Sequence, residues 1–120
     1  VATLLLFAMG GDVSSSTTMP GDYGVFSAFV FELVATFLFV TVILNVTRDE
    51  NNYLAGLAIG FALIVIHLAG IKVSGASVNP ARTLASNSFD VESLKMCWLY
   101  FAVPLLGGAL AGMVHKKFSA

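Results

Sequence analysis

Charged residues are scarce in this sequence, and cysteine is nearly absent. Only 11% of the 120 residues carry a formal charge, whereas 58% are apolar. Soluble domains carry about a quarter charged residues, so a water-soluble monomer is excluded. The net charge of −1 gives no electrostatic basis for binding nucleic acid. Cys97 is the single cysteine, which excludes an internal disulfide and a cysteine metal cluster. The composition predicts a membrane protein.

The chain also lacks the features of a signal peptide. It begins at Val1 inside an apolar run, with no basic residues before the run and no small-residue cleavage site after it. We therefore expect residues 1–11 to be the end of a helix whose beginning is missing. The sequence is interpreted as a fragment of a longer protein.

Three long apolar stretches follow, at residues 25–47, 53–71 and 96–114, and Glu32 is their single formal charge. A bilayer core needs about 20 apolar residues in a helix. The sequence therefore predicts an all-α membrane protein with one truncated and three full transmembrane helices. Two small-residue pairs, Gly56 with Gly60 and Gly108 with Gly112, either bring helices close together or reflect the general glycine content of membrane helices.

The connecting segments differ in character. Residues 11–24 are polar and rich in Ser, Gly and Thr, so we expect a flexible loop. Residues 48–52 are few and charged, which predicts a tight antiparallel pair of helices. Lys116 and Lys117 after the last span favour a cytoplasmic C-terminus. Lys72, Arg82 and Lys95 lie on the opposite side or within the membrane, so the charge bias is small.

Residues 72–95 contain a short helix that cannot span a bilayer. Asn79 is a good helix cap, and Pro80 fits a first helical turn. The following residues suffice for a little over two turns, about 12 Å. We expect residues 74–77 to run as extended backbone before them. Such a half-helix is allowed at membrane depth where it is buried in protein or lines a cavity. From these residues alone, a capped surface helix remains an alternative.

The segment from Ser74 to Arg82, SGASVNPAR, resembles the second Asn-Pro-Ala loop of the aquaporin (major intrinsic protein) family. His67 precedes Arg82 by the spacing that this family uses for its selectivity filter. Glu32 lies in the preceding span, where the family has a buried glutamate, and VPLLGG at residues 103–108 resembles the last helix. The resemblance covers essentially the whole chain, residues 1–120, as one channel domain. It implies the C-terminal inverted repeat (residues 25–118), preceded by the end of an earlier helix and an external loop.

The resemblance also implies roles for individual residues. Asn79 would donate a hydrogen bond to water at the middle of the membrane, and Glu32 would accept hydrogen bonds from loop N–H groups. Glu32 shares a helix face with small neighbours, which leaves room for the loop; a proton-relay carboxylate is the alternative. The implied selectivity filter consists of His67, Ala76 and Arg82, and the Asn-Pro-Ala motif of Asn79, Pro80 and Ala81.

The implied function is passive water transport that excludes protons, without a chemical step, cofactor or metal. A homotetramer in the plasma membrane is expected, with water as the permeant. His67 and Thr83 favour water over glycerol, because glycerol channels carry Gly and Asp there. Asn87 counts slightly against this assignment, since water-selective relatives usually have Ala at that position. Cys97 is expected to be a packing or lipid-facing thiol.

A remote alternative is an intramembrane serine protease of the rhomboid type, using Ser74 and His67. That family requires the pattern G-x-S-G, and Lys72 stands where its first glycine should be.

Overall fold

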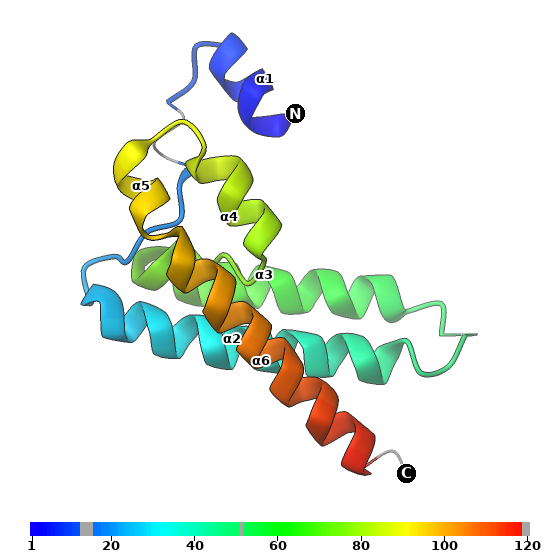
Figure 1. Ribbon diagram of the computed structural model, residues 1–120. Coiled ribbons are helices and arrows are strands. Elements are labelled where there is room, and N and C mark those ends of the chain that lie inside the picture. Colours follow the sequence, from blue (N-terminus) through cyan, green and yellow to red (C-terminus); the bar gives the residue numbers. More distant parts are fainter. Residues whose placement is uncertain (13–15, 51, 119–120) are drawn as a thin grey trace.

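Three long helices dominate the molecule (Figure 1). The computed structural model describes residues 1–12, 16–50 and 52–118. Helices α2 (Gly24–Val46), α3 (Ala55–Ser74) and α6 (Cys97–Phe118) are each long and apolar enough to cross a membrane. A helix of α2's length extends about 35 Å, which exceeds a hydrocarbon core of about 30 Å. The three predicted spans are confirmed, although α3 begins at Ala55 rather than at residue 53, and α6 continues to Phe118.

Helices α2 and α3 lie antiparallel and side by side, and α6 crosses them (Figure 1). Leu99, Tyr100 and Val103 of α6 form the centre of the core, against Phe29 and Leu33 of α2. The face of α2 that carries Glu32 is buried as expected, and it comprises Ala28, Glu32, Ala35 and Thr36.

Close approach of α2 and α6 depends on Gly107. A Cβ atom there would lie 2.7 Å from the Leu33 carbonyl oxygen, so a side chain would separate the two backbones. The predicted pairs behave differently. Within the described residues, nothing lies within 4 Å of a Cβ built at Gly56, Gly60 or Gly112. Gly108 lies beside α2, because a Cβ built there would be 3.7 Å from Val40 Cγ2, whereas the other three glycines approach no helix among the described residues.

Two short helices lie between α3 and α6. Helix α4 (Pro80–Asn87) is the predicted half-helix, and α5 (Val91–Lys95) was not expected. Asp90 caps α5 by accepting hydrogen bonds from the backbone N–H and the hydroxyl group of Ser93. These hydrogen bonds hold the pKa of Asp90 below its usual range. Asp is a common residue just before the first turn of a helix, so Asp90 could have predicted α5 from the sequence.

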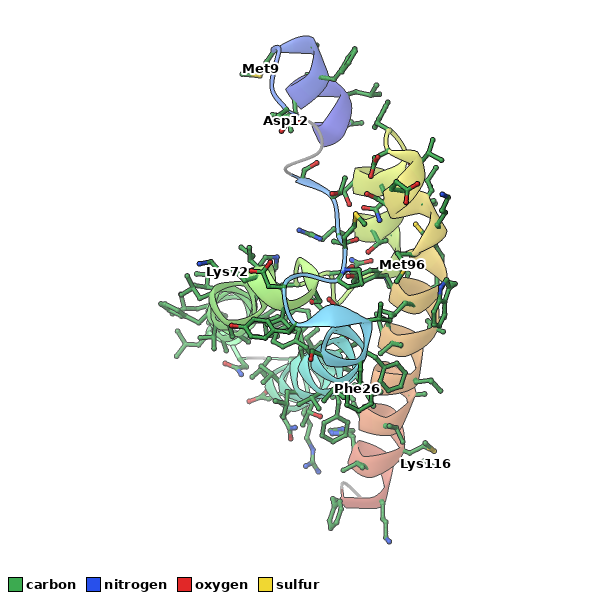
Figure 2. The ribbon with its side chains drawn as sticks, turned by 90° about the vertical axis from the view of Figure 1, so that its left-hand side faces the viewer. Met9, Asp12, Phe26, Lys72, Met96 and Lys116 are labelled. Carbon is green, nitrogen blue, oxygen red and sulfur yellow. The ribbon has the colours of Figure 1, made fainter. Side chains whose placement is uncertain are left out.

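The expectation of a flexible loop before α2 is wrong for residues 16–21, hereafter the 16–21 segment. Thr18 is fully buried, and the Gly21 N–H donates to the Val73 carbonyl oxygen at 2.9 Å. The segment runs beside α4 and α5 on its way to α2 (Figure 2). The preceding helix α1 (Ala2–Ala8) contacts the same region, because Phe7 stacks on Phe89 with ring centroids 6.5 Å apart.

Large apolar side chains cover the outside of the long helices. Leu68 of α3 is 82% exposed, and Phe26 of α2 is 78% exposed. The molecule measures 48 × 31 × 20 Å. Because it is only 20 Å thick, most helices have a face that no other part of the molecule covers. Exposed apolar surface of this extent marks a lipid or protein contact.

Candidate functional site

The chain reverses direction between α3 and α4 through an irregular turn. Gly75 caps α3 in the left-handed region, with φ of 77°. Ala76 and Val78 also have positive φ angles, 47° and 46°, which non-glycine residues rarely adopt. The expectation of extended backbone at residues 74–77 is therefore wrong. A strained conformation of this kind persists only where the surrounding structure holds it in place.

Glu32 provides much of that support. It is fully buried, and its Oε1 accepts hydrogen bonds from Ser74 Oγ at 2.7 Å and from the Ser77 N–H at 2.8 Å. Its Oε2 accepts from the Val78 N–H at 2.8 Å. Hydrogen bonds to a charged acceptor are stronger than neutral ones. The carboxylate on α2 thus fixes both the end of α3 and the strained turn.

Three further polar side chains support the turn, and sequence reasoning did not assign them this role. Tyr100 of α6 donates through its hydroxyl group to the Ser74 carbonyl oxygen at 2.7 Å. Ser74 Oγ accepts from the Ala76 N–H at 3.1 Å, and Ser77 Oγ donates to the Asn79 carbonyl oxygen at 2.8 Å. A tyrosine inside an apolar span is a signal that could have predicted such a contact, because a buried hydroxyl group needs a partner.

Asn79 begins the half-helix. Its Oδ1 accepts hydrogen bonds from the N–H groups of Ala81 at 2.9 Å and Arg82 at 3.4 Å, and Pro80 occupies the first turn. Asn79 is exposed, and no hydrogen bond among the described residues uses its Nδ2. The cap therefore leaves two N–H donors available at the positive end of the α4 dipole.

Arg82 lies in the first turn of α4 and is partly buried. Its Nη1 atom is buried and has no hydrogen-bond partner within the described part of the chain. Buried polar groups are nearly always paired, so an unpaired guanidinium nitrogen is a functional signal. Ala76, which the resemblance places in the same filter, is fully buried in the strained turn.

His67 lies on α3, apart from these hydrogen bonds. Its Nδ1 is 2.8 Å from the Leu63 carbonyl oxygen, which can only accept. Nδ1 therefore carries the proton, and in the neutral ring Nε2 is an acceptor. His67 borders a hollow of about 390 Å³ with Tyr23 and Lys72. No hydrogen bond or ion pair among the described residues joins it to Arg82, Ala76 or Asn79.

The described residues at this site offer several hydrogen-bond donors and one acceptor. Ser74, the nucleophile that a serine protease would need, is fully buried and donates to Glu32. Within the described residues, no group of three or more His, Cys, Asp or Glu side chains could hold a metal ion.

Known proteins match this chain over most of its length. A family model described as major intrinsic protein matches residues 1–115. Aquaporin Z of Rhodopseudomonas palustris is 40% identical over 102 residues, which make up 83% of this chain and 42% of that protein. Aquaporin Z of Bradyrhizobium diazoefficiens is 38% identical over 102 residues, with the same coverage. Aquaporin Z of Photorhabdus laumondii is 37% identical over 103 residues, 84% of this chain and 45% of that protein. The chain spans less than half the length of these relatives.

Proposed function

This chain belongs to the aquaporin (major intrinsic protein) family, a family of integral membrane proteins. We propose that it is the C-terminal half of a channel that conducts water and excludes protons. The main support for this proposal is the turn between α3 and α4, which Glu32 stabilises through three hydrogen bonds. This turn starts α4 at an exposed asparagine whose Nδ2 is not used by the cap. A second half-helix from the N-terminal half of the channel would meet it at the middle of the membrane.

Asn79 is the proposed contact for water at the narrow centre of the pore. Its Nδ2 would donate to the water oxygen, so both water hydrogens would point away from the centre. The positive end of α4 lies at the same point and disfavours cations. A water molecule held in this orientation breaks a proton wire, and the dipole opposes hydronium.

The proposed filter consists of His67, Ala76 and Arg82. The partly exposed guanidinium group of Arg82 supplies a fixed positive charge with N–H donors, which would repel cations and bind water. The Nε2 atom of His67 supplies an acceptor, since Leu63 takes the Nδ1 proton. Ala76 is included from the resemblance alone, since it is fully buried in the strained turn and its small side chain would leave room for the permeant.

We further propose that the channel prefers water to glycerol. The His67 side chain narrows the pore, where the resemblance implies glycine in glycerol channels. Thr83 is fully buried, and its hydroxyl group is hydrogen-bonded to the hydroxyl groups of Thr18 and Ser77. This buried site suits a neutral side chain better than a charged aspartate. A glycerol facilitator is the second candidate, because Asn87 departs from the residue usual in water-selective relatives.

The remaining assignments are also proposals. Residues 1–120 form one channel domain, in which residues 25–118 are the C-terminal inverted repeat. The whole protein crosses the plasma membrane several times with a cytoplasmic C-terminus, and four copies assemble. It needs no cofactor, because water moves passively down the osmotic gradient.

Stopped-flow light scattering on liposomes that hold the full-length channel tests the function. Sucrose and then glycerol would be applied to the wild type and to His67→Gly, with the exposed Ser88→Ala variant as the matched control. We expect fast shrinkage in both solutes and slow re-swelling in glycerol, with faster re-swelling for His67→Gly. A pH-sensitive dye inside the vesicles should report no proton flux above that of empty vesicles.

Other results would contradict the proposal at different points. Fast re-swelling of the wild type in glycerol would identify a glycerol facilitator. Water flux no faster than that of empty vesicles would contradict the proposed channel function.

A further inference from the structure

Asn87, the last residue of α4, is fully buried and makes a paired contact with a distant part of the chain. Its Oδ1 accepts from the Thr18 N–H at 2.9 Å, and its Nδ2 donates to the Thr18 carbonyl oxygen at 2.9 Å. One side-chain amide thus satisfies both backbone groups of a buried residue, as a neighbouring β-strand would. Nδ2 also donates to the Ser93 carbonyl oxygen at 3.1 Å, so the same side chain reaches α5.

Thr18 extends this contact to the start of the half-helix. Its hydroxyl group donates to Thr83 Oγ1 at 2.8 Å, with Asn87 Oδ1 as a second, longer acceptor at 3.3 Å, and Thr83 Oγ1 lies 2.6 Å from Ser77 Oγ. Because the Ser77 hydroxyl hydrogen goes to the Asn79 carbonyl oxygen, Thr83 must be the donor to Ser77. These hydrogen bonds connect Thr18 through Thr83 and Ser77 to Asn79.

The 16–21 segment is held at further points along the turn. A Cβ atom at Gly75 would lie 3.0 Å from the Thr18 Cα atom, so the segment packs directly on the left-handed cap of α3. The Gly21 N–H donates to the Val73 carbonyl oxygen at 2.9 Å. The segment thus crosses from the end of α4 to the end of α3 (Figure 2). In the sequence, Asn79 and Arg82 at the start of α4 lie between the attached residues Val73 and Asn87.

We propose that Asn87 is a positioning residue, which ties the 16–21 segment to α4 and thereby sets how strictly Arg82 and Asn79 discriminate between small neutral solutes. Asn87 itself does not touch the permeant. Thr83 directly follows Arg82, so a displaced Thr18 would free the first turn of α4 from its buried partner. The inference rests on the proposed channel function and assigns a selectivity role within it.

The test uses the full-length channel with Asn87→Ala and Asn87→Ser. The serine variant is neutral and keeps a polar side chain at the buried site while it removes both Nδ2 donors, so it covers the case in which the alanine variant does not fold. Ser88→Ala is the control, because Ser88 is exposed and, among the described residues, its hydroxyl group donates a hydrogen bond to the Leu84 carbonyl oxygen within the same helix. Hydrogen exchange of the peptide that contains Thr18 and the ratio of glycerol to water permeability are measured for each.

We expect exchange at Thr18 to rise about tenfold in Asn87→Ala, since both hydrogen bonds to its backbone groups are lost. Although the resemblance gives water-selective relatives Ala at this position, we expect the permeability ratio to rise about threefold in both Asn87 variants. In this chain the Asn87 amide pairs with both backbone groups of the buried Thr18, so its loss disturbs a contact on which the start of α4 depends. Loss of folded channel alone would lower both permeabilities together and leave their ratio unchanged. Ser88→Ala should match the wild type in both measurements.

Two results would overturn the inference without affecting the proposed function. One is a Thr18 amide that exchanges in the wild type as fast as in a free peptide. The other is an unchanged permeability ratio in folded Asn87 variants of a conducting channel. A wild type that does not conduct water refutes the proposed function, and with it the selectivity role.

Discussion

At the scale of single residues, burying Glu32 inside an apolar helix has a large free-energy cost. A buried charge is tolerated only when it is paired or fully hydrogen-bonded, and Glu32 meets this condition through Ser74, Ser77 and Val78. The geometry assigns the carboxylate to the turn rather than to proton transfer, because both oxygen atoms already accept hydrogen bonds from the loop.

Glu32→Gln should therefore damage the fold and not open a proton path. An amide nitrogen cannot accept a hydrogen bond, so at least one donor of the turn loses its partner, at a cost of about 1–3 kcal/mol. We expect a lower unfolding temperature in detergent and reduced water flux from vesicles. Glu92→Gln is the control, because Glu92 pairs with Lys95 on an exposed surface where such pairs contribute little. Unchanged stability, or new proton leakage, would contradict this prediction.

At the scale of elements, local sequence predicted what local physics determines. The three long helices follow from apolar length, and α4 follows from the Asn79 cap and Pro80. The positive φ angles of Ala76 and Val78 had no local signal, because neither is glycine. They depend on a carboxylate that lies more than 40 residues earlier. The burial of Thr18 likewise depends on Asn87, 69 residues away, so composition alone indicated a flexible loop.

The packing of the 16–21 segment on α3 gives a sharp prediction at this scale. In Gly21→Ala the added Cβ would lie 1.9 Å from the Lys72 carbonyl oxygen, so one backbone must move. Overpacking of this kind costs about 1–3 kcal/mol. We expect a lower unfolding temperature and faster hydrogen exchange in residues 16–23. The exposed neighbour provides the control, since Asp22→Ala should change neither quantity. If Gly21→Ala behaves like Asp22→Ala, the segment does not pack on α3 as described.

At the scale of the whole molecule, the two ends of the bundle carry different structures. The turn, α4, α5 and the 16–21 segment gather at one end of α6, near Met96 (Figure 2). Lys116 lies toward the other end of α6 (Figure 2), and residues 48–52 join α2 to α3 at their ends remote from Ser74. The basic residues Arg48, Lys116 and Lys117 therefore belong to the helix ends away from the candidate site, and the positive-inside rule supports the proposal that these ends face the cytoplasm.

Sidedness is tested by single cysteines in the full-length channel, in a background without other cysteines and with Cys97→Ser. Glu50→Cys and Glu92→Cys both replace exposed residues, one between α2 and α3 and the other on α5. A membrane-impermeant maleimide applied to intact cells should label Glu92→Cys and leave Glu50→Cys unlabelled until the cells are opened. The opposite pattern would contradict the proposed orientation and would place the end of the channel that carries α5 on the cytoplasmic side. Because Lys72, Arg82 and Lys95 nearly balance the other basic residues in the sequence, the labelling pattern decides a question that charge counting leaves close to even.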